Sequence, residues 1–139
     1  MIYLDIDGVL ILRGDAPDSP QVKARADMVR QLSLDTGARI ILCSQRRISD
    51  DVLDLLTFLG LDGLMSQDQD PKTPFIPHDD LDPDLPVRGQ EIDAHMLANR
   101  PDRHVILDDD HALAHHNHIM VDPDIGLTAD DIAAARAFL

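Results

Sequence analysis

The 139 residues include 26 Asp and Glu against 12 Lys and Arg, which gives a formal charge of -14 at pH 7. Such acidity disfavours non-specific attraction to nucleic acid or anionic lipid, so we expect no strong direct nucleic-acid affinity. Hydrophobic residues make up 44% of the chain, which fits a globular core, and no apolar run approaches the roughly 18 residues that a membrane span requires. The single cysteine, Cys43, and the lack of a charged-then-apolar leader predict a cytoplasmic protein without an internal disulfide.

Strand-like and helix-like patterns alternate along the chain, beginning with the apolar run Ile2–Leu10. This run breaks into two aspartates and a glycine where a buried parallel strand should end. A helix follows, with Ser19 as its N-cap, Pro20 in its first turn and Gly37 as its stop. The later predicted elements are a strand at 38–43, a helix from Ile48 to Gly60, a short strand at 61–65, a helix at 89–99, strands at 104–107 and 118–121, and a closing helix capped by Thr128. The alternation predicts a layered α/β fold with a mainly parallel sheet.

Residues 66–87 interrupt this regularity. They contain prolines at 71, 74, 77, 83 and 86 among many aspartates, which excludes an uninterrupted helix or a central strand. We interpret the segment as an acidic, proline-rich surface excursion within a single domain that spans residues 1–139.

Polar residues suited to metal and phosphate chemistry follow three of the predicted strands. They are Asp5 and Asp7, then Ser44, then Asp108 and Asp109. The carboxyl ends of parallel strands share one edge of a sheet, so these residues should become neighbours there. Asp5 and Asp7 are two apart, which in extended backbone places both carboxylates on one side, where they repel unless a cation lies between them. Gly8 permits the sharp turn that would leave such a cation accessible.

These segments resemble the four motifs of the haloacid dehalogenase (HAD) superfamily of aspartate-nucleophile phosphatases. The four are Asp5-Ile6-Asp7-Gly8-Val9, Ser44 after Ile40-Ile41-Leu42-Cys43, the basic Arg88, and Asp108-Asp109 after Val105-Ile106-Leu107. A finer resemblance, to the HAD domain of Swiss Army Knife RNA-repair proteins, rests on residues 88–92, 105–110, 122–123 and 126–128. The resemblance implies a three-layer αβα, Rossmann-like fold.

The resemblance also implies a division of roles among the carboxylates. Asp5 would be the nucleophile that forms an aspartyl-phosphate, and Asp7 would act as general acid toward the leaving oxygen and then as general base toward water. Mg²⁺ would be bound by Asp5, the backbone carbonyl of Asp7 and Asp109, with Asp108 as an additional ligand or behind the first shell.

The remaining implied site residues contact the phosphoryl group or the substrate. Ser44 would donate a hydrogen bond to the phosphoryl oxygens, and Arg88 would neutralise charge that develops on them. The expected substrate-binding residues are Gly8, Ser44, Gln45, Arg46 and Arg88. Arg88 departs from the lysine that is usual in the superfamily, and Gln45 stands where the RNA-repair relatives lead us to expect an aromatic residue.

Several of these residues also have purely structural interpretations. Ser44 suits a helix N-cap, and Arg88 suits the exposed start of a helix. Arg46 and Arg47 could guide a polyanion or simply lie on a solvated helix start. Four histidines raise the question of a zinc site: His111, His115, His116 and His118. Their spacing matches no standard zinc site and no cysteine accompanies them, which favours solvated or locally bonded side chains.

The segments between the motifs contain too few residues for a large cap domain. Only 36 residues separate Asp7 from Ser44, and 43 separate Ser44 from Arg88, so a minimal cap or none is expected. An open site suits a phosphate at the end of a large molecule, such as a nucleic-acid terminus, or a nucleotide. Two alternatives stand beside this Mg²⁺-dependent phosphohydrolase: a non-catalytic module that binds Mg²⁺ and a phosphorylated partner, and a dehalogenase, which the acid at Asp7 disfavours.

Overall fold

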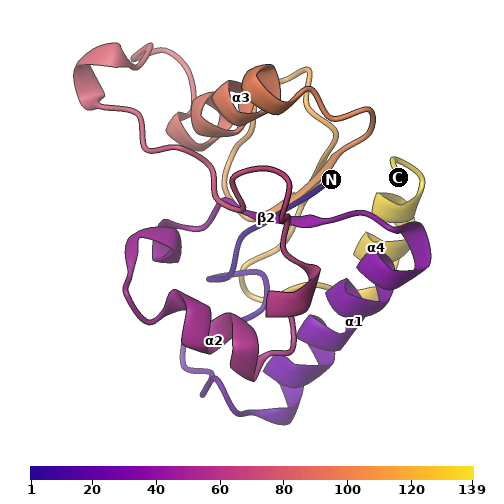
Figure 1. The fold of residues 1–139 in the computed structure, drawn as a ribbon. Coiled ribbons are helices and arrows are strands. Elements are labelled where there is room, and N and C mark those ends of the chain that lie inside the picture. Colours follow the sequence, from indigo (N-terminus) through magenta and orange to yellow (C-terminus); the bar gives the residue numbers. More distant parts are fainter.

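A four-stranded parallel sheet with helices on both faces forms the centre of the computed structural model, which describes all 139 residues (Figure 1). The strands are β1 (Ile2–Leu4), β2 (Ile40–Leu42), β3 (Val105–Asp108) and β4 (His118–Met120), in the spatial order β2-β1-β3-β4. The α-helices are α1 (Pro20–Thr36), α2 (Val52–Phe58), α3 (Val87–Asn99) and α4 (Ala129–Arg136). The predicted α/β class and its parallel sheet are confirmed.

Alternation along β1 divides the core into two parts. Ile2 and Leu4 belong to a large apolar cluster that includes residues of α1, α2 and α4. Tyr3 points to the other face of the sheet, into a smaller cluster with Ile92 of α3. Figure 1 shows the same division, with α3 on one side of the sheet and α1 and α4 on the other. Because side chains alternate along a strand, the short β1 contributes to both layers.

The ends of α1 follow the local signals of the sequence. Ser19 accepts a hydrogen bond from the backbone N–H of Val22, and Gly37 ends the helix in left-handed backbone with φ 71°. At α4, Thr128 and Asp131 form a reciprocal capping box. These caps satisfy backbone groups that have no partner within the helix.

One predicted element is wrong, and another begins later than predicted. Residues 61–65 form a 3₁₀ helix, η2 (Asp62–Leu64), and only Met65 makes a single bridge to Ile40. Asp62 and Gly63 are exposed, so the segment lacks the continuous buried run of a parallel strand. The helix predicted from Ile48 begins at Val52 instead, after a 3₁₀ turn, η1 (Gln45–Ile48), because extended backbone at Ser49 (ψ 141°) separates the two.

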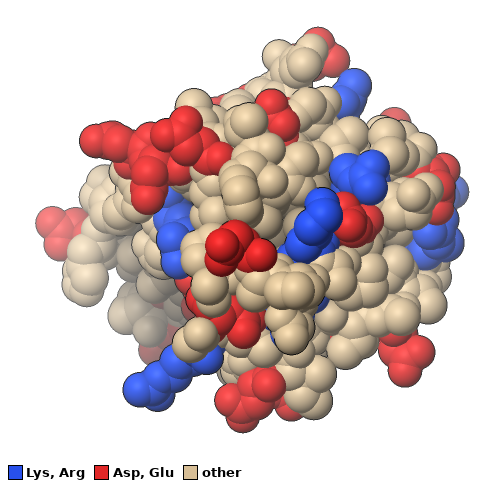
Figure 2. Space-filling model, turned by 90° about the horizontal axis from the view of Figure 1, so that it is seen from below, with Lys and Arg blue, Asp and Glu red and all other residues tan.

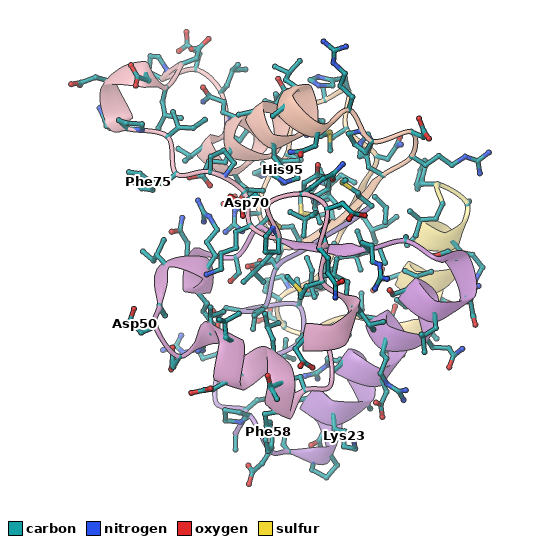
Figure 3. All side chains as sticks on the ribbon, viewed as in Figure 1. Lys23, Asp50, Phe58, Asp70, Phe75 and His95 are labelled. Atoms are coloured by element: carbon teal, nitrogen blue, oxygen red, sulfur yellow. The ribbon has the colours of Figure 1, made fainter.

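The excursion at 66–87 leaves the edge of β2 and projects beyond α3 (Figure 1). Its base is fixed by backbone bonds, since Leu42 N–H donates to Pro71 and Thr73 N–H donates to Leu42, at 2.7 and 3.0 Å. Near this base lie Asp70 and His95 (Figure 3), and His95 Nε2 is 2.8 Å from the backbone carbonyl oxygen of Asp70. The excursion itself contains only the short 3₁₀ helix η3 (His78–Asp80). No folded cap therefore stands between α2 and α3.

None of the helices has both the length and the apolar character needed to cross a membrane. On the face shown in Figure 2, acidic and basic side chains are interspersed, and no continuous basic surface is present. A surface of this kind offers no track for a nucleic-acid backbone on that face.

Candidate active site

A tight turn after β1 separates the first two aspartates. The Ile6 carbonyl accepts hydrogen bonds from the backbone N–H groups of Val9, Leu10 and Ile11, and Gly8 has φ 84°. Asp5 stays in line with β1, where it is 4% exposed, whereas Asp7 is carried onto the surface. Extended backbone does not continue from Asp5 to Asp7, because β1 ends at Leu4, so one carboxylate is buried and the other exposed.

Three carboxylates gather where β1 and β3 end. Oxygen atoms of Asp5, Asp108 and Asp109 all lie within 4.8 Å of one another. Asp108 is fully buried, and Asp109 packs against the backbone of Gly8, where an added Cβ would lie 2.3 Å from Asp109 Oδ2. The sequence therefore needs a glycine at position 8 for both its backbone conformation and this close approach.

The electrostatics of this cluster favour a bound cation. Burial, followed by the charge of Asp5, raises the pKa of Asp108 to about 7. Burial and the interaction with Asp5 also raise the pKa of Asp109. Crowded carboxylates with only oxygen donors match the preference of a hard divalent cation such as Mg²⁺, which would offset their repulsion. The donor set at this edge of the sheet thus fits the metal that the sequence led us to expect.

Arg88 lies under this cluster, in the first turn of α3. It is 6% exposed, and its Nη1 atom lies 3.4 Å from Asp5 Oδ1 and 3.3 Å from Asp108 Oδ2. The same atom donates a hydrogen bond to the Cys43 carbonyl. Burial opposes the charged form, but the carboxylates of Asp108 and Asp5 and the hydrogen bond to Cys43 outweigh this effect and raise the pKa of Arg88. The interpretation of Arg88 as an exposed helix-start residue is therefore wrong.

Cys43 lies beside the same carboxylates, in the interior of the protein. Its Sγ atom lies 3.5 Å from Asp108 Oδ2, and the residue is fully buried. Burial, followed by the charge of Asp108, raises the pKa of the thiol well above its ordinary value. Cys43 is therefore a neutral thiol and not a reactive thiolate.

The turn after β2 brings a second group of predicted residues to this edge. Ser44 is buried, and its Oγ atom accepts a hydrogen bond from the backbone N–H of Arg46 at 3.3 Å. Arg46 also binds both carboxylate oxygens of Asp7, with Nε and Nη2 at 2.8 and 2.9 Å. Gln45 is exposed. Ser44 thus caps the 3₁₀ turn, and Arg46 connects that turn to the loop after β1.

A cavity of about 580 Å³ opens beside these residues. Its polar lining includes Asp7, Arg13, Arg46, Asp109 and Asp124, and none of its lining residues comes from the excursion at 66–87. Asp7 and Asp109 line this cavity, whereas the buried Asp5 and Asp108 do not. A substrate can therefore approach without displacing the excursion.

Arg47 differs from the sequence interpretation of a solvated or substrate-guiding residue. It is buried and forms an ion pair with Glu91 of α3 at 2.7 Å. It also donates to the carbonyls of Ser44, Thr73 and Pro74. Arg47 therefore joins the turn after β2 to α3 and to the base of the excursion. Sequence reasoning missed Glu91 because a charged residue in a helix is usually solvated.

The comparisons with known proteins agree with this architecture. A family model for the HAD domain in Swiss Army Knife RNA repair proteins matches residues 1–132. The chain belongs to this family. The HAD assignment implies phosphohydrolase-type activity, and the family places the domain in the context of RNA repair. Neither the curated proteins nor the solved structures include a significant match.

Proposed function

We propose that this HAD domain is a Mg²⁺-dependent phosphohydrolase that acts on a phosphorylated nucleic-acid end or a nucleotide through an aspartyl-phosphate on Asp5. The observation that carries the proposal is the convergence of Asp5, Asp108 and Asp109 beside the buried Arg88. Four charged groups kept at a sheet edge are costly to bury, which favours a functional role for them.

Asp5 is the proposed nucleophile. One of its carboxylate oxygens attacks phosphorus, the bond from phosphorus to the leaving oxygen breaks, and that oxygen takes a proton from Asp7. Asp7 then removes a proton from the water that attacks the phosphoryl group, so that inorganic phosphate leaves and Asp5 is restored. When held by Asp5, Asp108, Asp109 and the Asp7 carbonyl, Mg²⁺ supplies positive charge that lets an anionic phosphate approach these carboxylates.

A substrate phosphate that binds at this site would compete with Asp7 for Arg46. Arg46 binds Asp7 through both guanidinium nitrogens in the free protein, and a phosphate is a competing partner for the same fork. Transfer of Arg46 from Asp7 to the phosphate would free Asp7 for proton transfer. Arg46 would thus couple substrate binding to the readiness of the general acid.

Ser44 and Arg88 are proposed to stabilise the phosphoryl group. Because Ser44 Oγ already accepts a hydrogen bond from the Arg46 N–H, its hydroxyl proton remains available for a phosphoryl oxygen. Arg88 supplies a fixed positive charge next to Asp5. Such groups act where charge develops in the transition state.

The substrate class follows from the open site and the family. No lining residue of the cavity comes from a cap or from the excursion, so a phosphate at the end of a long chain can reach the edge of the site at Asp7 and Asp109. The net charge of -14 opposes binding along a nucleic-acid backbone. Recognition of a terminal phosphate, and not of an extended strand, is the mode that fits both features.

Phosphate release from 3'- and 5'-phosphorylated oligonucleotides, nucleotides and an aryl phosphate, with Mg²⁺ present, tests this proposal. We expect turnover that chelation and Asp5→Asn both abolish, while Asp102→Asn, the same change at an exposed aspartate, leaves it intact. Absence of phosphate release from the whole panel would contradict the proposed activity.

One observation favours the alternative of a non-catalytic Mg²⁺ and phosphate-binding module: Asp7, the proposed acid, is held in an ion pair. Asp7→Asn with p-nitrophenyl phosphate separates the two functions, because this leaving group needs little protonation. A phosphohydrolase would release about one equivalent of nitrophenol per chain and accumulate phosphorylated Asp5, detected by intact mass. Binding of phosphate ligands without any such burst would favour the binding module.

A further inference from the structure

We propose that Asp93, His115 and His116 form a second metal site, which binds Zn²⁺ and is separate from the carboxylate cluster. Asp93 lies in α3, and the two histidines lie in the loop between β3 and β4. None of the three belongs to the proposed phosphoryl-transfer site, so the inference goes beyond the proposed function.

Two imidazole nitrogens converge on one carboxylate oxygen. Asp93 Oδ1 lies 2.9 Å from His115 Nε2 and 3.3 Å from His116 Nε2. The three potential ligand atoms all lie within 4.8 Å of one another. Ligands about 2.0–2.1 Å from a tetrahedral zinc ion are about 3.3 Å apart. Small side-chain shifts would therefore admit the ion.

The donor set selects a different metal from that of the carboxylate cluster. Two imidazoles and one carboxylate suit Zn²⁺, whereas Mg²⁺ prefers oxygen ligands alone. The His116 side chain is fully buried, and burial lowers its pKa although Asp93 opposes the effect. It is thus kept in the neutral form that ligates metals. Its Nδ1 atom has no hydrogen-bond partner, so Asp93 is the only hydrogen-bond partner of this ring.

The proposed site keeps one coordination position open. Asp93 and His115 line a cavity of about 310 Å³ together with Arg100 and His104. The His115 side chain is 65% exposed, so solvent reaches the cluster. Three protein ligands with water in the fourth position are a common zinc arrangement.

The position of the site suggests what the ion would do. Asp93 is five residues beyond Arg88, which corresponds to about 7.5 Å along the helix axis. The loop that carries the two histidines also begins with Asp109 and packs tightly on α3, because a Cβ at Gly89 would lie 2.7 Å from the backbone nitrogen of Leu113. A zinc ion would fasten this loop to α3 and so support both sides of the phosphoryl-transfer site without contacting the substrate.

Zinc titration of the chelator-stripped full chain in excess Mg²⁺ tests the proposal, with calorimetry and metal analysis after dialysis as readouts. We expect about one zinc per chain, in wild type and in Asp109→Asn alike. Loss of even an outer-shell partner typically costs about 10- to 100-fold in metal affinity, so His115→Ala should weaken zinc binding at least about tenfold. His111→Ala, a change at an exposed histidine of the same loop, should not.

Cobalt provides a spectroscopic check, since Co²⁺ in a four-coordinate imidazole site absorbs visible light. We expect this absorption in wild type and its loss in His115→Ala and Asp93→Asn, with circular dichroism showing that both variants are folded. No zinc binding in excess Mg²⁺ would overturn the proposal, as would zinc binding that survives His115→Ala but not Asp109→Asn. Zinc binding that depends on His115 supports it whether or not the protein releases phosphate.

Discussion

We expect the contribution of Asp108 to the stability of the metal-free protein to fall as the pH rises from about 4 to about 7, because Asp108 must ionise inside the core. Burial and the neighbouring Asp5 raise the pKa of Asp108 from an ordinary 3.8 to about 7. The unfolded chain therefore gives up this proton at lower pH than the folded protein does. Between these two pH values Asp108 binds more protons in the folded state than in the unfolded state, so its contribution to the free energy of unfolding falls as pH rises.

The size of this effect follows from the same shift. Each pKa unit corresponds to about 1.4 kcal/mol, so the contribution of Asp108 is on the order of 4 kcal/mol. It is fully present below about pH 4 and lost above about pH 7. A domain typically has about 5–15 kcal/mol of stability in total, which makes a change of this size measurable.

Urea unfolding of wild type and Asp108→Asn at pH 4.5 and pH 8, with chelator present, isolates this contribution. The asparagine carries a packing cost that does not depend on pH, so we expect the variant to gain about 3–4 kcal/mol relative to wild type between the two conditions. Mg²⁺ at pH 8 should stabilise wild type and have much less effect on the variant. A stability difference between the two proteins that is the same at both pH values would refute the reasoning.

Three further substitutions test the geometry around the site. Gly8→Ala places a Cβ against Asp109, so stabilisation by Mg²⁺ in thermal unfolding should be lost, with about 1–2 kcal/mol of strain from the left-handed backbone. Glu91→Ala leaves the buried Arg47 without its ion-pair partner and should cost about 3–5 kcal/mol in urea unfolding. Arg88→Lys keeps a positive charge but shortens the side chain whose Nη1 atom contacts Asp5 and Asp108, so kcat should fall about 10- to 100-fold while the Mg²⁺ requirement remains.

Each of these variants has a matched control. Gly63→Ala adds a Cβ in open space and should leave the response to Mg²⁺ unchanged. Asp27→Ala removes the partner of a half-exposed ion pair and should barely move the unfolding midpoint. Arg30→Lys makes the same change as Arg88→Lys on the surface of α1 and should leave kcat unchanged. If a control variant behaved like its test variant, the effect could not be assigned to the contact that the test variant changes.

The local elements of the fold were accessible from sequence. Ser19 and Gly37 mark the ends of α1 because capping depends on residues a few positions apart. The alternation of strand and helix patterns indicates a parallel sheet, and the motifs around Asp5 and Asp108 indicate the family from the sequence alone. These signals depend on residues that are close together in the sequence. They can therefore be recognised without knowledge of any long-range contact.

Only the tertiary structure shows which charged side chains pair in the interior of the protein. Only the folded chain pairs Arg47 with Glu91 in the interior, since the two residues are remote in sequence and each taken alone is typical of a solvated surface. Asp93 likewise meets His115 only across the contact between α3 and the loop after β3. Which charged side chains are buried together depends on how the layers pack, and a single sequence does not record that packing.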